Sequence, residues 1–140
     1  MKRLVPVLLA VWFVSCTEMA GPPILVSDVV VTAAARDMPM AAAYFDISNR
    51  SGEDIRVTRV TSPNYESVEI HETTIEDGIA RMRKLDAVEV PDNETVRFER
   101  GGLHLMLMRP VDDGENITLN FYQQDLLIVS VNTVFALPAE

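Results

Sequence analysis

The amino-acid sequence predicts an all-β sandwich, and three observations support this fold class. Short runs of alternating apolar and polar residues recur along the chain, as is typical of strands with one buried face. Turn-forming segments, such as 49–52 (Asn-Arg-Ser-Gly) and 76–78 (Glu-Asp-Gly), separate many of these runs. No stretch shows a convincing apolar stripe with the 3.6-residue period of a helix. We therefore expect antiparallel sheets packed face to face, with a closed barrel as the alternative.

The predicted strands follow one another between residues 24 and 134. Each is short, rich in β-branched or other apolar residues, and at least partly alternating. They are Ile24–Thr32, Met40–Asn49, Ile55–Thr61, Val68–His71, Ile79–Leu85, Ala87–Val90, Thr95–Phe98, Leu103–Met108, Ile117–Tyr122 and Leu126–Val134.

An alanine-rich region between the first two strands could suggest a helix. It includes Ala33–Ala35 and Ala41–Ala43, and Met38-Pro39 interrupts it. Because proline disfavours the helical conformation of the residue before it, we expect a loop here that leads into a strand.

The N-terminus has the features of an export signal. Lys2-Arg3 precedes the apolar run Leu4–Val14, which is shorter than the roughly 20 residues needed to span a bilayer. The run ends just before Cys16, in an arrangement that resembles the lipobox of bacterial lipoproteins. The resemblance implies a signal peptide over residues 1–15 that is removed before a lipidated Cys16.

The rest of the chain would then form a tether over residues 16–23 and one domain over residues 24–136. Thr17 follows the cysteine, which by the sorting rules of such lipoproteins favours the outer membrane over the inner one. Phe13 departs from the usual leucine of the lipobox, so an ordinary secretory signal cut near Ala20-Gly21 is the alternative. In either case we expect a periplasmic protein that contacts the membrane only through its lipid anchor, if it has one.

Composition excludes several classes of function. The net charge is −9 and no Lys/Arg cluster is present, so nucleic acid is not an expected partner. Cys16 is the only cysteine, so the chain cannot form an intramolecular disulfide, and the folded domain has no thiolate to bind a metal. A metal site would therefore depend on other side chains.

The segment Leu103–Met108 is the most informative part of the sequence. It alternates its three leucines with His104, Met106 and Met108, so the two sets would lie on opposite faces of a strand. Leucines suit a buried face. Imidazole and thioethers together are ligands that suit a soft ion such as Cu(I).

The remaining histidine and a further methionine extend this set into a spaced pattern. His71, Met82, His104 and Met106 form the motif His-x10-Met-x21-His-x-Met. This motif resembles the metal-binding motif of the periplasmic copper chaperones of the PCu(A)C type. The resemblance covers roughly residues 24–135 and includes the flanking segments 42–49, 68–73, 82–83, 90–91 and 101–108.

The resemblance implies a cupredoxin-like, Greek-key β-sandwich that binds Cu(I) at its surface through these four residues. It also implies that the ion passes to a recipient such as the copper centre of a terminal oxidase, sometimes with a Sco-type thioredoxin-like partner. Some members have a methionine directly after the first histidine, where this chain has Glu72. Some also have a His/Met-rich C-terminal tail for Cu(II), which is not found before Glu140.

The chemistry of the four residues agrees with such a role. Thioethers are not protonated, whereas imidazole binds a metal only when neutral, so copper affinity should fall in mildly acidic solution. Glu69 and Glu72 flank His71 and could orient its ring from outside the ligand set. Met108 could be a reserve thioether or could pack beneath the site.

The alternative hypotheses belong to two other classes of function. One is a structural or adhesive Ig-like lipoprotein module that binds a protein partner without metal. The other is an enzyme, which we do not expect, because no catalytic triad, phosphate-binding loop or paired acids near a histidine stands out. The leading hypothesis is a monomeric Cu(I) chaperone.

Overall fold

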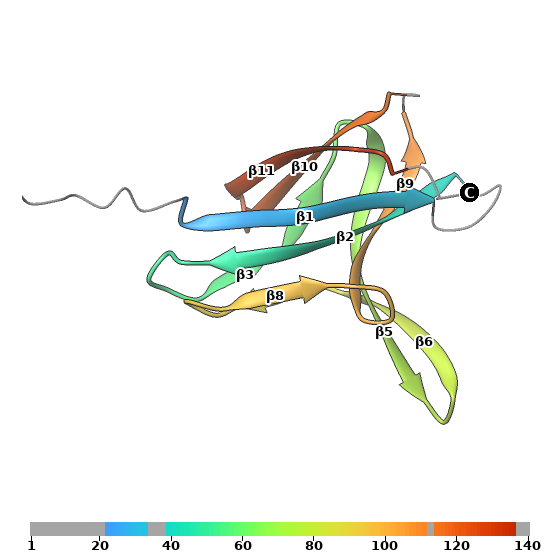
Figure 1. Cartoon of the computed structure of the whole chain (residues 1–140), viewed down its shortest axis with the longest axis horizontal. Coiled ribbons are helices and arrows are strands. Elements are labelled where there is room, and N and C mark those ends of the chain that lie inside the picture. The colour runs from blue at the N-terminus through green and yellow to red at the C-terminus, as the bar shows by residue number, and fades with distance from the viewer. Residues whose placement is uncertain (1–21, 34–38, 112–113, 137–140) are drawn as a thin grey trace, which may run out of the picture.

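The computed structural model of the chain describes residues 22–33, 39–111 and 114–136, and these residues contain strands but no helix (Figure 1). All of the predicted strands are present, in the predicted order. Their bounds are β1 Ile24–Ala33, β2 Met40–Asn49, β3 Ile55–Val57, β4 Arg59–Thr61, β5 Tyr65–Glu76, β6 Ile79–Leu85, β7 Val88–Val90, β8 Thr95–Phe98, β9 Leu103–Pro110, β10 Asn116–Gln123 and β11 Leu126–Val134.

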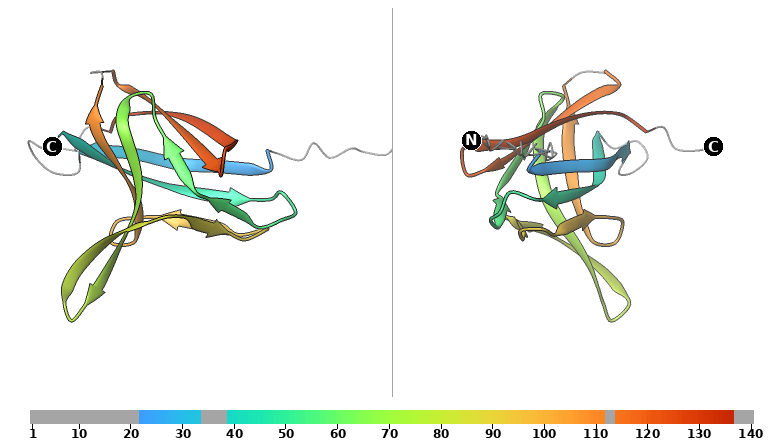
Figure 2. Two further views of the ribbon diagram at one scale, coloured as in Figure 1. Left: turned by 180° about the vertical axis from the view of Figure 1, so that it is seen from behind. Right: turned by 60° about the vertical axis from the view of Figure 1, so that its left-hand side comes forward.

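The strands form a β-sandwich, which confirms the predicted fold class. The large sheet has the order β1-β2-β9-β5-β6, with β8 also pairing with β2. The strands β11-β10-β4 form a second sheet, and β3 pairs with β7. All of these strand pairs are antiparallel. The hairpin of β5 and β6 projects beyond the rest of the sandwich (Figure 2).

The core lies between the two larger sheets and follows the alternation in the sequence. Leu105 and Leu107 are completely buried, as the leucine face of the segment 103–108 predicts. Phe45 of β2 stacks on Phe98 of β8 at 4.2 Å between ring centroids and meets Phe121 of β10 edge-on at 5.2 Å. These aromatic contacts join the large sheet to the opposite one.

The predicted strand Ile55–Thr61 is two strands that belong to different sheets. β3 pairs with β7, whereas β4 pairs with β10. The break falls at Thr58, whose backbone N–H donates to the Tyr122 carbonyl and whose hydroxyl accepts from the backbone N–H of Gln124. These bonds hold the chain where it passes from one sheet to the next.

The predicted strand Val68–His71 is longer in the structure. It belongs to β5, which continues to Glu76, so His71 lies within a strand and not at its end. The turn at Asp77-Gly78, which the sequence predicts, connects β5 to β6. The extension gives the β5–β6 hairpin its length beyond the core.

Several expectations fall on residues that the structure does not describe. The signal peptide over residues 1–15, Cys16, most of the 16–23 tether and Met38 lie outside the described residues. Within the described part of the chain, no helix is long and apolar enough to cross a membrane. The domain boundaries at residues 24 and 136 stay a prediction.

Candidate metal centre

The candidate ligands lie on the face of the large sheet that is turned away from the core, which we call the outer face. Leu105 and Leu107 of β9 belong to the core, so His104 and Met106, one position along, point to the opposite side. On β5, Ile70 belongs to the core, so His71 also points outward. Residues directly opposite one another on paired strands share a face, which brings these side chains together.

The two histidines are direct neighbours across the β5–β9 pair. His71 lies opposite His104 in the register of the two strands, and their ring centroids are 5.9 Å apart. His104 is 4% exposed, and the side chain of His71 is 17% exposed. The sequence separates these residues by more than thirty positions, and the antiparallel register brings their rings together.

The two methionines lie on either side of the imidazole pair along the strands. Met106 is opposite Glu69 on β5, and Met82 of β6 is opposite Thr73. Each is therefore a diagonal neighbour of His71, at about 7–8 Å between backbone positions, within reach of a long side chain. Met82 is 56% exposed on the projecting hairpin. The four residues share the outer face, with the imidazoles closest and the thioethers flanking them.

Hydrogen bonds leave one ring nitrogen of each histidine available. The Gly102 carbonyl lies 3.0 Å from Nδ1 of His104, and a carbonyl can only accept, so Nδ1 has the proton and Nε2 a lone pair. Nε2 of His71 lies 2.9 Å from Oε2 of Glu69. Nδ1 of His71 is buried and has no hydrogen-bond partner among the described residues. A bound cation would satisfy this otherwise costly buried atom.

Glu69 links His71 to the charge of a lysine. Its Oε1 accepts from Nζ of Lys84 at 2.8 Å, while Oε2 accepts from His71. The hydrogen bond from Lys84, and after it the one from His71, lowers the pKa of Glu69 below its ordinary value of 4.5. An ionised Glu69 keeps the proton of neutral His71 on Nε2, which directs the lone pair to Nδ1.

The other two residues considered as supporting groups are placed differently. Glu72 follows His71, so it points to the opposite face, where Oε2 accepts from Nε and Nη2 of Arg83 at 2.9 and 2.7 Å. It does not reach the His71 ring. Met108 lies on the outer face, opposite Met40 of β2 and two residues beyond Met106.

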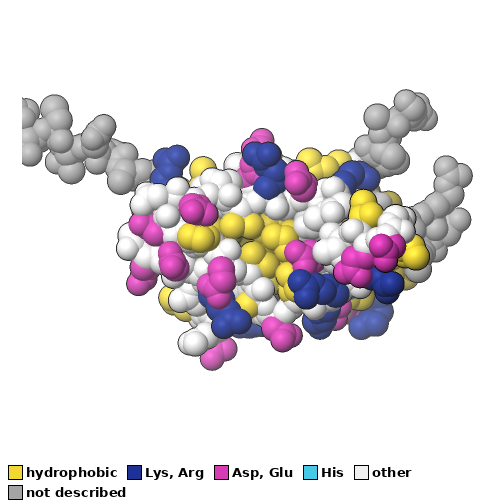
Figure 3. All heavy atoms as spheres, turned by 90° about the horizontal axis from the view of Figure 1, so that it is seen from below, with side chains coloured by type: hydrophobic (Ala, Val, Ile, Leu, Met, Phe, Trp, Pro, Cys, Tyr) yellow, Lys and Arg dark blue, Asp and Glu magenta, His cyan; other side chains and the backbone are white. Residues whose placement is uncertain are grey.

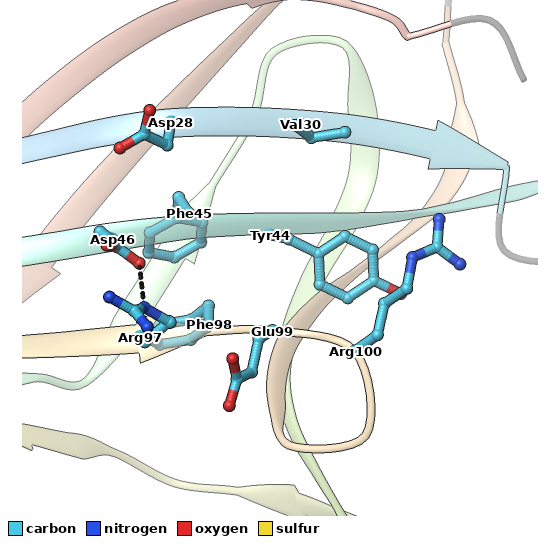
Figure 4. A pocket seen from close by; sticks show the side chains of 9 residues that line it. All are labelled: Asp28, Val30, Tyr44, Phe45, Asp46, Arg97, Phe98, Glu99 and Arg100. Carbon is cyan, nitrogen blue, oxygen red and sulfur yellow. Dashed lines mark hydrogen bonds and ion pairs between the residues drawn. The ribbon is translucent and has the colours of Figure 1, made fainter. Parts of the chain in front are cut away.

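Tyr44 is a neighbour of the imidazole pair to which the sequence gave no role. Its ring centroid lies 6.3 Å from that of His104, and the guanidinium of Arg100 lies 5.2 Å over its ring. Tyr44 and Arg100 also line an open pocket of about 270 Å³ beside β1, β2 and β8 (Figure 4). Arg97 pairs with Asp46 at 3.2 Å in the same pocket. The alternation of buried residues in β2 places Tyr44 on the outer face. This alternation is visible in the sequence and could have identified Tyr44 as a neighbour of the site.

The donor set is unlike that of a zinc or calcium site. Among residues 22–33, 39–111 and 114–136, no group of three or more His, Cys, Asp or Glu side chains could hold a metal ion. The outer face instead offers two imidazoles and flanking thioethers, all uncharged when the histidines are neutral. Such donors favour a soft monovalent ion over a hard divalent one.

Comparisons with known proteins agree on a family and a fold. Residues 24–134 match the family model described as "Putative lipoprotein LpqE-like". The chain is 29% identical over 90 residues to "Putative lipoprotein Lxx21020" of Leifsonia xyli, a match that covers 61% of this chain and 54% of that protein. The chain spans about half the length of the curated relatives it matches.

Two solved structures show the same fold. The copper-bound PCuAC domain from PmoF2 superposes with a TM-score of 0.62 at 21% identity, covering 86% of this chain and 97% of that one. The solution structure of CuI-DR1885 from Deinococcus radiodurans has a TM-score of 0.63 at 24% identity, covering 86% and 82%. The described strands therefore have the architecture of PCuAC domains, as the sequence motif implies.

Proposed function

Because the chain belongs to the LpqE-like lipoprotein family and has the fold of PCuAC domains, we propose that it is an extracytoplasmic metallochaperone for Cu(I). In this proposal His71, His104, Met82 and Met106 hold the ion as cargo. The solved neighbours named for bound copper support the choice of metal.

The main support is the arrangement of the imidazole pair. Two histidines from separate strands lie opposite each other, each with a ring nitrogen left without a proton when neutral, and one of these nitrogens is buried and unpartnered. A structural role would normally satisfy a buried imidazole nitrogen with a protein donor or acceptor. A metal ion between the two rings accounts for the pair and for the orphaned atom together.

The same arrangement suits carriage of an ion better than catalysis. Neutral donors leave bound Cu(I) with its positive charge, and thioethers are adaptable ligands that can be exchanged one at a time. Met82 is exposed on the projecting hairpin and is the donor that a recipient protein would reach most readily. We propose that Cu(I) passes to the recipient by ligand exchange that begins at Met82. We propose no enzymatic activity for the chain.

A competition titration tests the proposed site. The full chain with Cys16→Ser, which removes the lone thiol, is titrated with Cu(I) against a chromophoric chelator. His71→Ala and His104→Ala should each weaken binding by more than about 100-fold, since each removes a direct ligand. Met82→Leu should weaken it less.

Ile75→Ala is the matched control, because Ile75 is an exposed apolar residue on the same hairpin and has no donor atom. Its affinity should equal that of the parent chain. Equal affinity of the parent chain and the double histidine variant would refute the site and leave the alternative, a metal-independent protein-binding module.

We further propose that Cys16 is lipidated and anchors the domain to the periplasmic side of a bacterial membrane. The lipoprotein description of the family supports this. The recipient would be the copper centre of a terminal oxidase, reached directly or through a Sco-type protein. Transfer of Cu(I) from the purified loaded chain to such a recipient, followed spectroscopically, is the measurement that checks this part.

A further inference from the structure

The outer face has a second group of thioethers beside the imidazole pair. Met40 of β2 lies directly opposite Met108 of β9, and Met106 lies two residues before Met108 on the same face. We call Met40, Met106 and Met108 the methionine cluster. The backbone N–H of Arg109 donates to the Pro39 carbonyl at 2.9 Å, which fixes the register of β2 and β9 at this point.

Packing in the core does not account for these methionines. The three side chains are partly exposed, and none belongs to the core cluster or to the partly buried residues packed against it. Ala42, which lies opposite Met106 on the same face, is only 3% exposed and is also outside the core cluster. The methionines therefore lie beside a small residue on the outer face, where two neighbouring strands present thioethers on the same side of the sheet.

The chemistry of the cluster suits one class of ligand. Thioethers are uncharged, soft donors that select ions such as Cu(I), and they offer little to hard divalent cations. Met40 and Met108 are as close in register as His71 and His104 are, and directly paired residues have Cβ atoms about 4.5–5.5 Å apart. Glu69, the acidic group nearest to Met106 in register, is already bonded to Lys84 and His71.

We propose that Met40 and Met108 form a second binding site for a soft monovalent ion, Cu(I) or Ag(I), with Met106 placed between this site and the imidazole pair. Met106 lies two residues from His104 and two from Met108, a step of about 6.6–6.8 Å along the strand in each direction. It can serve either ion, so the outer face holds two neighbouring sites joined by one shared thioether. This goes beyond the single-ion chaperone proposed above.

The test counts ions and identifies the methionines that bind them. The full chain with Cys16→Ser, labelled with ¹³C at its methionine methyl groups and kept in a non-ionic detergent, is titrated with Ag(I) and separately with Cu(I). The first equivalent should shift the methyl signals of Met82 and Met106. The second should shift those of Met40 and Met108, while Met1 and Met19 stay unmoved.

Variants separate the two sites. Met40→Leu with Met108→Leu keeps volume and apolar character, and it should lose the second ion and retain the first. His71→Ala with His104→Ala should lose the imidazole site and still bind one ion at Met40 and Met108. Met82→Leu is the matched control, because it removes a thioether on the other side of the imidazole pair and should leave the second ion in place.

The outcomes are distinct for the two proposals. Binding of a single ion by the parent chain, or a second ion that survives the double leucine substitution, would overturn the methionine site. One ion retained by the double histidine variant with shifts at Met40 and Met108 would support it, even if the imidazole site itself failed its own test.

Discussion

Single residues decide which atoms of the candidate site can bind. His71 and His104 have the same side chain, yet their hydrogen bonds leave opposite ring nitrogens available, Nδ1 in the first and Nε2 in the second. This difference is set by the residue two positions before each histidine, which is Glu69 for His71 and Gly102 for His104. Both histidines were predicted from the sequence as ligands, and Glu69 and Glu72 were both predicted as supporting groups of His71. In the structure only Glu69 lies on the same face of the strand as His71 and contacts its ring.

Replacing Glu69 should change stability in a pH-dependent way. The pKa of Glu69 is lowered in the folded state, so its contacts with Lys84 and His71 stabilise the fold above its ordinary pKa of 4.5. That contribution disappears as the pH falls through the lowered pKa. We expect Glu69→Gln to destabilise the metal-free chain by about 0.5–1 kcal/mol at neutral pH, and the difference from the parent chain to vanish at an acidic pH below the lowered pKa of Glu69.

Urea unfolding at the two pH values in the presence of a chelator measures this difference. Glu89→Gln is the control, because Glu89 pairs with Arg56 at 3.1 Å and both side chains are more than half exposed. Its effect at neutral pH should be smaller. A constant penalty for Glu69→Gln at all pH values would show that the carboxylate acts by its shape and not by its charge.

Among the elements, the β5–β6 hairpin has the largest role in the site. It brings Met82 to the outer face, and its strand β5 pairs directly with β9. Asp77 and Gly78 both have positive φ, 52° and 78°, as a two-residue type I′ turn requires. The Asp-Gly pair is a strong hairpin signal, and the sequence predicted a turn here for that reason.

Gly78→Ala should therefore loosen the hairpin and weaken metal binding together. A Cβ at Gly78 would meet no atom within 4 Å, so the cost is one of backbone conformation alone, about 1–2 kcal/mol. We expect a similar loss of stability and a several-fold loss of Cu(I) affinity, because Met82 is then less firmly placed. Thermal unfolding and the chelator competition measure the two effects.

Gly52→Ala is a matched control for this variant. Gly52 has φ of 89° and equally open surroundings, but it lies in the segment between β2 and β3. It should destabilise the fold to a similar extent and leave the affinity unchanged. Equal losses of affinity in both variants would mean that global stability, and not the hairpin, controls binding.

Alternation enforced by the core is one source of correctly predicted strand limits but not the only one, because the limits of the largely exposed β6 (Ile79–Leu85) also match the prediction. Met40–Asn49 and Thr95–Phe98 match the sequence prediction, since their alternate residues are buried. The break at Thr58 was missed, although the buried positions Val57 and Val60 are out of phase with a single strand. The length of β5 was missed because its distal half lies beyond the core, where no burial pattern forms.

Over the whole molecule, strand order is what assembles the site, and no local pattern specified it. β9 lies between β2 and β5, which are far from it and from each other in the sequence. The His-x10-Met-x21-His-x-Met spacing matched a known family and so implied the assembly without deriving it. The spacing does not predict the registers of β5 with β6 and β9, which place the two thioethers on either side of the imidazoles. It also does not predict the register of β2 with β9, which places Met40 opposite Met108.

The net charge of −9 has little influence at the site itself. Acidic and basic groups are mixed around exposed apolar side chains on the face seen in Figure 3. Glu69 pairs with Lys84, and Glu72 pairs with Arg83, within the β5–β6 hairpin. Attraction of a cation to the chain is therefore general and screened by salt, and selectivity must come from the donor atoms.

Binding at the proposed site should stabilise the entire fold, because its ligands come from three strands. An ion held by His71 of β5, Met82 of β6 and His104 of β9 adds a link across three strands that already pair with one another. A ligand that binds only the folded state at about 100 times its Kd contributes about 2.7 kcal/mol. For a domain of this size that corresponds to a rise in Tm on the order of 10 °C. Calorimetry at buffered free Cu(I) should show this rise for the parent chain, a much smaller rise for His71→Ala with His104→Ala, which retains only the proposed methionine site, and none with Zn²⁺. A rise of the same size in the double histidine variant would place the stabilising ion elsewhere on the molecule.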